Sequence, residues 1–440
     1  MHPPPPDRHL NCYLGNERAI ALEGPNVLIA HNPVANSGEL LKRFADARAE
    51  SDRLFAIIRP DALYERPIAD RHRIVFYLGH LEAFEGNLFR GTVGLPSFHP
   101  EFDRLFAFGI DPVGTELPSD RPEEWPTLEK IREYNQRLRD QIDARAITDA
   151  QLLNVAIEHR LMHCETLAYM FHRLPLDRKV RAASAPLAFS NEPPRPSMVE
   201  IPAGAATLGL SSSSGTFGWD NEFEAHTVVL PAFAIDRFKI SNAQYLEFMQ
   251  TGGYENREWW TDADWDWKTA NNVAHPAFWR RSGDAWRYRA MFDEIPLPPD
   301  WPVYVSHAEA SAYARWAGKK LPTEAQWQRA AQGAQPTGNA DFKSWDPTPI
   351  NAFPETSSDF GAVEMIGNGW EWTSTVFTPF AGFEPFPFYP GYSANFFDDK
   401  HYVMKGGSPR TAACMLRPSF RNWFQPHYPY VYAGFRCVDN

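Results

Sequence analysis

Two histidines four residues apart, His159 and His163, are the residues of this sequence with the clearest capacity for chemistry. Side chains at positions i and i+4 of a helix project from one face, about 6 Å apart along the axis, so these two imidazoles can share one metal ion. Glu165 stands about 200° round such a helix from His163, and we therefore expect it to face elsewhere.

Two ligands are too few for a catalytic metal site, so a third should come from another segment. His80 is the best candidate, because it lies among apolar residues of a predicted helix over 70–89. His72 is an alternative, but its place two residues after the expected helix cap, Asp70, favours exposure to solvent. Three neutral imidazoles leave coordination positions open. This favours mononuclear non-haem iron(II) over a closed structural zinc site, although imidazole binds both metals.

Four amphipathic segments are expected to position these histidines. Apolar residues recur at helical spacing in segments 37–58, 70–89, 127–146 and 148–174. Thr148 and Gln151 form a capping-box pattern at the start of the last one. Helices of similar length joined by loops predict a four-helix bundle. The loop over 90–125 is unusually long and rich in Phe, Pro and Gly, which is typical of a functional loop.

From residue 199 onward, short strand-like runs alternate with turns, and helices are expected only at 306–317 and 323–331. The predicted fold class is therefore α+β. We expect four parts along the chain: an extended N-terminal arm (1–34), a helical bundle (35–178), a Pro-rich linker (179–198) and a loop-rich domain (199–440).

The overall composition excludes several classes of protein. The chain has 440 residues, with 43 basic and 55 acidic side chains and a net charge of −12, so nucleic acid and anionic membranes are not expected partners. No apolar run approaches the roughly 18 to 20 residues that span a bilayer, and the first residues do not form a signal peptide. Four scattered cysteines do not suggest a disulfide framework, so a reducing cytoplasm is the expected location.

The second half also contains a series of recognisable motifs, from Val199 to the C-terminus: Leu321-Pro322-Thr323-Glu324, Gly367-Asn368-Gly369-Trp370-Glu371-Trp372, Lys405-Gly406-Gly407-Ser408 and Ala433-Gly434-Phe435-Arg436-Cys437. In order and spacing they resemble the formylglycine-generating-enzyme (sulfatase-modifying-factor, C-type-lectin-like) fold. The first half is similar to the DinB-like four-helix bundle, mainly through its histidine pattern.

The two halves in this order resemble the sulfoxide synthases of ergothioneine biosynthesis. The resemblance implies iron(II) held by His80, His159 and His163, with O2 and a chalcogen donor bound at the metal. It also implies that the expected partners are small molecules. The reaction would join the chalcogen to C2 of the imidazole of hercynine, the trimethylated betaine of histidine.

Segment 420–424 matches the hercynine-binding segment of that family. By this resemblance Asn422 would bind the carboxylate or imidazole of hercynine, and Trp423 would pack against its quaternary ammonium. Such a cation–π contact is typically worth about 0.5 to 2 kcal/mol. The alternative is that Trp423 is only a core aromatic residue of the second domain.

The chain departs from the ergothioneine type where an amino-acid donor would bind. Two adjacent tyrosines are absent from 105–114. Phe424 replaces an acidic residue of the γ-glutamylcysteine-using branch, and Met162 replaces a Gln before the last histidine ligand. The catalytic Tyr of that branch has no clear counterpart in 380–388. These departures favour the related selenoneine synthases, which take a selenosugar as donor. An ergothioneine synthase that uses γ-glutamylcysteine or cysteine is the alternative.

Two hypotheses come from other classes. One is a true formylglycine-generating oxidase, which binds copper through a close pair of cysteines. Cys414 and Cys437 are far apart in this sequence, and this disfavours it. The other is a non-catalytic module that binds a metal and a ligand. Cys164, beside a predicted ligand, is expected to be a buried packing residue.

Two further groups of polar residues attract interest. Asp220, Asn221 and Glu222 could bind calcium, but such a run is more typical of a turn cap. His427 and Tyr428, which follow the predicted hercynine-binding segment, could line its pocket.

Overall fold

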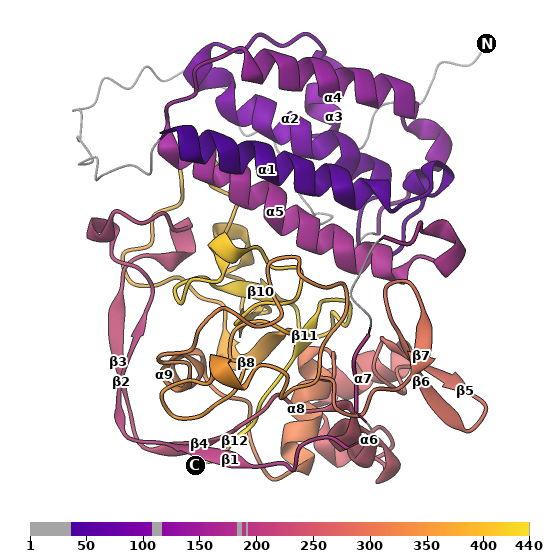
Figure 1. The fold of residues 1–440 in the computed structure, drawn as a ribbon, viewed down its shortest axis with the longest axis vertical. Helices are drawn as coiled ribbons and strands as arrows, with labels where there is room; N and C mark the ends of the chain where they lie inside the picture. Colours follow the sequence, from indigo (N-terminus) through magenta and orange to yellow (C-terminus); the bar gives the residue numbers. More distant parts are fainter. Residues whose placement is uncertain (1–36, 108–116, 183–186, 191, 440) are drawn as a thin grey trace.

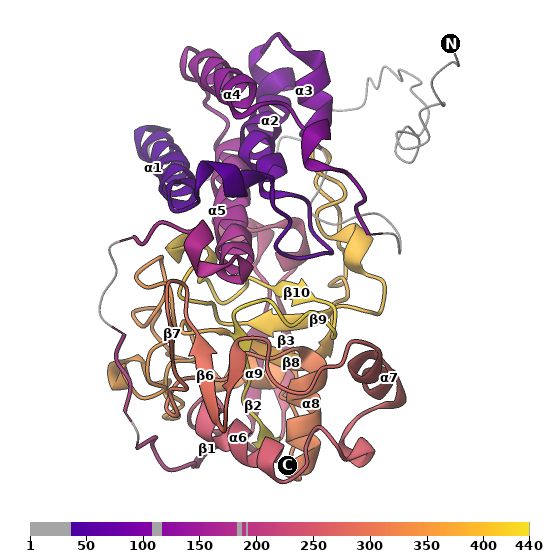
Figure 2. The ribbon, with the colours of Figure 1, turned by 90° about the vertical axis from the view of Figure 1, so that its right-hand side faces the viewer.

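The chain folds into a helical bundle stacked on a larger domain of short strands and loops, with helix α5 at the boundary (Figures 1 and 2). The computed structural model describes residues 37–107, 117–182, 187–190 and 192–439. This architecture confirms the predicted α+β fold class. The predicted N-terminal arm, residues 1–34, lies outside the described residues.

The bundle consists of four long helices and one short one: α1 (Ser37–Ala56), α2 (Ile74–Val93), α3 (Pro100–Leu105), α4 (Leu128–Asp143) and α5 (Ala150–Arg173). Helix α4 illustrates why these segments are helical. Thr127 caps its start by accepting from the backbone N–H of Lys130, and a buried apolar stripe follows at helical spacing: Ile131, Tyr134, Leu138 and Ile142. The short α3 interrupts the loop predicted over 90–125.

Two predicted helix starts are wrong. Helix α5 begins at Ala150, because the carboxylate of Asp149, not the hydroxyl of Thr148, accepts from the backbone N–H of Leu152 at 3.0 Å. Helix α2 begins at Ile74 and not at residue 70. The chain first makes a turn that ends at Arg71, and the residue before the helix is extended, so Asp70 does not cap it.

The second domain contains four small sheets. A three-stranded antiparallel sheet has the order β1 (Met198–Ile201), β4 (Phe233–Asp236), β12 (Val438–Asp439). The four-stranded sheet that faces the bundle has the order β10 (Asn422–Phe424), β9 (Tyr402–Lys405), β8 (Trp370–Val376), β11 (Ala433–Gly434), in which only β11 pairs in parallel. The others are the hairpin of β2 (Gly204–Leu208) with β3 (His226–Leu230), and the antiparallel set β5 (Trp279–Ser282), β6 (Ala285–Arg289), β7 (Glu294–Pro296).

Four helices belong to this domain: α6 (Asn242–Gln250), α7 (Asp262–Ala270), α8 (His307–Trp316) and α9 (Glu324–Ala330). The last two match the predicted helices to within a residue. Helices α6 and α7 were not predicted. The signal for α6 was present, because Ser241 and Gln244 form the same capping box that begins α8 and α9.

A single hydrophobic core continues from the bundle into the second domain, and α5 is buried along most of its length. The helix therefore packs on two sides, against α1 and α2 above and against the second domain below (Figure 1). Among the described residues, no helix has both the length and the apolar composition needed to cross a bilayer.

Candidate metal centre

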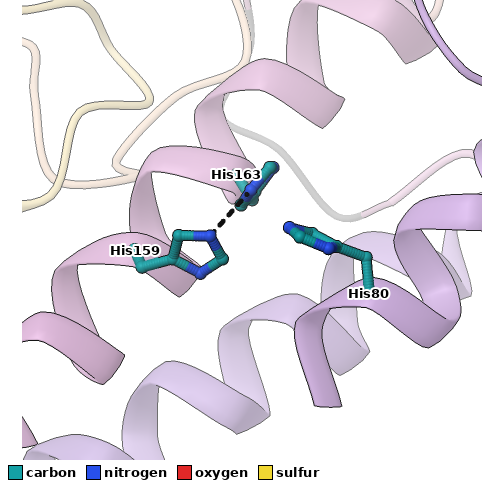
Figure 3. A group of neighbouring side chains, drawn as sticks. All are labelled: His80, His159 and His163. Carbon is teal, nitrogen blue, oxygen red and sulfur yellow. Dashed lines mark hydrogen bonds between the residues drawn. The ribbon is translucent and has the colours of Figure 1, made fainter. Parts of the chain in front are cut away.

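Three buried histidines from two helices meet between α2 and α5 (Figure 3). His80 comes from α2, and His159 and His163 come from successive turns of α5. Their ligand nitrogens all lie within 4.8 Å of one another. The Nε2 atoms of His159 and His163 are 3.2 Å apart, and the ring of His80 lies 5.3 and 4.9 Å from the two other rings. The structure thus brings together the three predicted ligands.

The chemistry of this group fits a metal ion. The Nδ1–H of His80 donates to the carbonyl of Phe106 at 2.7 Å, which fixes the tautomer and leaves Nε2 as a lone-pair donor. That Nε2 is buried and has no hydrogen-bond partner. Burial lowers the pKa of His80 to about 4 and holds the pKa values of His159 and His163 well below their usual range. All three rings are therefore neutral at pH 7, as metal ligands must be.

A glycine makes the contact to His80 possible. A Cβ atom at Gly79 would lie 2.6 Å from the ring of Phe106, so only glycine lets this ring approach α2. Phe106 is fully buried and its carbonyl holds His80. Gly79, directly before the predicted ligand His80, thereby allows the approach of Phe106, whose carbonyl orients the His80 ring.

The neighbouring residues considered in the sequence analysis, His72, Cys164 and Glu165, do not join the three histidines. His72 is partly buried, and its ring packs against that of Phe76, 4.2 Å away. Cys164 is fully buried, and burial raises the pKa of its thiol to about 12, in keeping with a packing role. Glu165 faces the second domain, as expected, where its carboxylate accepts from Trp370 Nε1 at 2.7 Å.

An aromatic wall lines one side of the histidines. Phe84 stacks on His159 with ring centroids 3.4 Å apart, and Tyr389 packs on both rings, 5.3 Å from Phe84 and 6.2 Å from His159. Burial, and then the charge of Asp220, raise the pKa of Tyr389 to about 12, so its phenol is protonated at neutral pH.

Tyr389 and its neighbour Tyr392 were missed by the sequence analysis, which stopped at Phe388. The hydroxyl of Tyr392 lies 3.3 Å from the sulfur of Met162, one residue before the predicted ligand His163. The signal that could have found them is the return of tyrosine directly after a run of Phe and Pro.

The predicted substrate residues lie on β10, next to this wall. Trp423 stacks on Phe377 at 4.2 Å and lies 5.5 Å from the rings of Tyr392 and Phe396. The side-chain oxygen of Asn422 accepts from the backbone N–H of Trp423 at 2.9 Å, and this bond does not use its amide N–H groups.

Phe424 projects from the opposite face of β10 to Trp423 and packs against the bundle. Its ring stacks on Tyr428 at 5.2 Å and meets the edge of Tyr169 of α5 at 6.4 Å. Arg71, just before α2, donates to the hydroxyls of both tyrosines, at 2.8 and 2.9 Å. Tyr428 therefore packs with Phe424 and Tyr169 on the bundle side of β10, so its place in the hercynine pocket stays a prediction.

His427 lies apart from both Phe424 and the Phe84–Tyr389 wall. Its Nε2 contacts Asp264 at 2.8 Å, and its ring stacks on Trp267 of α7. Asp220, Asn221 and Glu222 form a buried 3-10 turn, in line with the expected turn cap.

Helix α5 is bound to the second domain by a polar stripe with a spacing of seven residues. Glu158, Glu165 and His172 are buried, and every one of them bonds to that domain. Glu158 accepts from Trp219 and Arg417. Glu165 accepts from Trp370, Ser408 and Thr411. His172 bonds to the hydroxyl of Tyr432 and the carbonyl of Arg289. The helix that carries His159 and His163 is thus anchored on another side by ionic and polar contacts.

Comparison with known proteins gives two family matches. The sulfatase-modifying factor enzyme 1-like domain matches residues 184–440, and the DinB superfamily matches residues 43–163. Both agree with the predicted order of the two halves.

Among curated relatives, the chain is similar to "Hercynine oxygenase" of Mycolicibacterium thermoresistibile (38% identity, over 52% of this chain and 56% of the relative). It is also similar to "Ergothioneine biosynthesis protein 1" of Neurospora crassa (29% identity, 86% of this chain, 55% of the relative). The chain spans 56 to 60% of the length of the first three curated relatives that it matches. A solved structure, PvdO from Pseudomonas aeruginosa, covers 55% of this chain and 93% of its own at 18% identity and a TM-score of 0.36.

Proposed function

Since the chain belongs to the family of the sulfatase-modifying factor enzyme 1-like domain, we propose that it is an iron(II)- and O2-dependent enzyme that joins selenium or sulfur to C2 of the imidazole ring of hercynine. The observation that carries this proposal is the group of three buried, neutral histidines beside an aromatic wall and the Asn422-Trp423 pair. The names of the relatives, hercynine oxygenase and ergothioneine biosynthesis protein 1, support it.

His80, His159 and His163 would hold the iron. Bound there, iron(II) supplies coordination positions for O2 and for an anionic chalcogen donor. The three neutral imidazoles leave the charge of the metal undiminished, which favours an anionic donor. The carbonyl of Phe106 orients His80, and the stripe on α5 orients the other two.

Hercynine would bind along β10. The face of Trp423, together with Tyr392, offers an aromatic surface to the trimethylammonium group, which cannot form ordinary hydrogen bonds. The free amide N–H groups of Asn422 would donate to the carboxylate or the imidazole. Holding both reactants beside the histidines supplies proximity and orientation.

Tyr389 would supply a proton in the reaction. Its ring meets that of His159 edge to face, and its raised pKa keeps the phenol protonated at neutral pH. In the balanced reaction the C2–H and chalcogen–H bonds give way to one C–chalcogen bond. One oxygen atom of O2 passes to the chalcogen and the other leaves as water.

We propose a selenosugar as the donor, and therefore a selenoneine synthase. Phe424 is enclosed by the rings of Tyr169 and Tyr428, so no carboxylate stands at this position to hold the amine of an amino-acid donor. Met162, which contacts Tyr392, leaves no amide at the position before the last ligand. The loop that lacks the two tyrosines, 105–114, lies mostly outside the described residues. An ergothioneine synthase that uses γ-glutamylcysteine or cysteine is the alternative.

The two hypotheses from other classes make different predictions. A formylglycine-generating oxidase would bring two cysteines to one copper ion. Cys414 instead lies in the cluster of Arg417 at the domain contact, whereas Cys437 is buried beside Asp236. A non-catalytic module would bind metal and ligand but would not consume O2.

The proposal is tested with protein loaded with iron(II) under anaerobic conditions. Hercynine and O2 are then supplied with a 1-seleno-sugar, γ-glutamylcysteine or cysteine, and the products are identified by mass spectrometry. A selenium-bearing product from the selenosugar alone supports selenoneine synthesis. A sulfoxide from a thiol assigns the ergothioneine reaction instead. Absence of product and of O2 consumption with every donor overturns the proposed enzyme activity.

A further inference from the structure

Asp220 is a buried carboxylate without a cationic partner. Its side chain is 1% exposed. One oxygen, Oδ1, accepts from the hydroxyl of Ser393, whereas Oδ2 is buried and has no hydrogen-bond partner. In the described part of the chain, Asp220 forms no ion pair, although its neighbour Glu222 pairs with Arg417. A buried, unpaired carboxylate is costly, and burial raises the pKa of Asp220, so a nearby cation would favour its ionised form.

The carboxylate stands directly behind the aromatic wall. Ser393, its hydrogen-bond donor, directly follows Tyr392 in the sequence. On the other side, Trp219 precedes Asp220 and stacks on the ring of Tyr392 at 3.9 Å. Asp220 thereby joins the turn at 220–222 to the loop that carries both tyrosines of the wall.

The negative charge reaches the rings of that wall. Burial raises the pKa of Tyr389, and the charge of Asp220 raises it further. The pKa of Tyr392 is raised well above its usual range by burial and by the charges of Glu222, Asp220 and Glu158. Since Arg417 pairs with both glutamates, Asp220 is the carboxylate of the three that has no counter-charge.

An organic cation explains these features better than a metal ion does. Asn221 Oδ1 is also buried without a partner and could join Asp220 in binding a metal. Glu222, however, is occupied by Arg417 and Ser419. Among the described residues, the three histidines are the only group of His, Cys, Asp and Glu with a spacing that could hold an ion. A quaternary ammonium needs aromatic faces and a nearby negative charge, but no hydrogen bond.

We propose that Asp220 is a specificity-determining residue, whose unpaired carboxylate behind Tyr389 and Tyr392 selects a substrate with a permanent positive charge. The inference rests on the proposed function, because it places the trimethylammonium end of hercynine against this wall. Asp220 acts through the electric field and not by contact, so the interaction is lost when the charge is removed, even if the shape of the wall is kept.

The test compares two ligands that differ in the ammonium group. Hercynine and 3-(imidazol-4-yl)propanoate, which lacks the ammonium, are titrated into iron(II)-loaded protein by anaerobic calorimetry. Asp220→Asn keeps the shape of the side chain and its bond to Ser393 but removes the charge. We expect about tenfold weaker binding of hercynine and an affinity for the propanoate that is unchanged within twofold. If Asp220→Asn does not fold, Asp220→Ser takes its place.

Ser393→Ala is the matched control, because it removes the hydroxyl that bonds to Asp220 but leaves the charge. It should bind hercynine like the wild type. If Ser393→Ala lost as much hercynine affinity as Asp220→Asn, the position of the loop at Ser393, and not the charge of Asp220, would determine binding. That result would overturn the inference. Equal binding of hercynine by Asp220→Asn and wild type would overturn it as well.

Two further outcomes separate this inference from its premises. Calcium alone is titrated into the wild type, and binding that Asp220→Asn abolishes would assign the carboxylate to a metal ion instead. If the wild type does not bind hercynine at all, the proposed function fails, and this inference fails with it. If the wild type binds hercynine but shows no dependence on Asp220, only this inference fails.

Discussion

The ring of His80 and the carbonyl of Phe106 are joined by a hydrogen bond of 2.7 Å that only one tautomer of the imidazole can form. A carbonyl oxygen can only accept, so the proton sits on Nδ1 and the lone pair on Nε2 faces the other histidines. One backbone contact from Phe106, the residue that follows α3, thus leaves the Nε2 lone pair of a side chain of α2 available to a metal ion.

Replacement of His163 by alanine should abolish metal binding and keep the fold. Two histidines cannot hold the ion as three can, so iron content should fall from one ion per chain to nearly none, and turnover should fall by about 10³-fold or more. Metal analysis and circular dichroism measure the two effects. His72→Ala, at the rejected alternative ligand, is the control and should retain its iron. Normal iron content in His163→Ala would refute the ligand assignment.

Gly79→Ala should disturb the metal site from outside it. The added Cβ would meet the ring of Phe106 at 2.6 Å, and displacement of Phe106 would loosen His80. We expect a loss of about 1 to 3 kcal/mol in the free energy of unfolding, and about 10- to 100-fold weaker metal binding. Gly91→Ala in the same helix is the matched control. Nothing lies within 4 Å of its Cβ, so it should be neutral or slightly stabilising. Equal behaviour of the two variants would rule out the steric argument.

Tyr389→Phe should separate proton transfer from binding. The ring that packs against Phe84 is kept and the acidic hydroxyl is lost. Loss of a general acid typically costs about 10² to 10⁴ in rate, so kcat should fall by about that factor, with KM for hercynine little changed. Steady-state kinetics with hercynine as the varied substrate measures kcat and KM. An unchanged kcat would show that the proton comes from another group.

Acidification should destabilise the metal-free protein. Burial lowers the folded-state pKa of His80 to about 4, whereas an unfolded histidine titrates near 6.5. Below pH 6.5 the unfolded chain binds the proton first, so the free energy of unfolding is constant above that pH and falls between about pH 6.5 and 4. For His80 alone the total loss is about 3 kcal/mol. Urea unfolding at pH 7, 6 and 5 measures it. His80→Gln should show a shallower slope, and an identical slope would contradict this origin.

Glu165→Ala should weaken the contact between the domains. Its carboxylate accepts from Trp370, Ser408 and Thr411. Without it the buried N–H of Trp370 would have no partner, and the two hydroxyls would each lose a bond. We expect a loss of about 3 kcal/mol in the free energy of unfolding. Glu133→Ala, at an exposed position of α4, is the control and should change it by no more than about 0.5 kcal/mol. A similar small effect in both variants would show that the contact contributes little.

The helical part of the site could be predicted from the sequence because its geometry is local. The spacing of His159 and His163 fixes their common face, and the apolar surroundings of His80 point it into the bundle. Helix ends were less predictable. Thr148 and Asp149 are both good capping residues, and the choice between them depends on where the preceding loop enters.

The aromatic part of the site could not be predicted in this way. Met162 and Tyr392 are 230 residues apart in sequence and meet only because the two domains pack together. No periodicity marks the loop that carries Tyr389, since it is placed by the contact of Tyr389 with Phe84 and the bond of Ser393 to Asp220, and not by a regular element. The motifs of the second domain identify its fold, but the partners of each side chain depend on how distant segments pack in three dimensions.

Helix α5 carries two of the proposed metal ligands, His159 and His163, on one side and the stripe of Glu158, Glu165 and His172 on the other. The two halves are therefore held together by these buried contacts and not only by the covalent linker. A chain cut between residues 182 and 187 would give two fragments, each with buried donors or acceptors that only the other can satisfy. Such fragments should behave as the unlike subunits of a heterodimer. For the same reason, the bundle cannot be exchanged for that of a relative unless the face beneath it is exchanged as well.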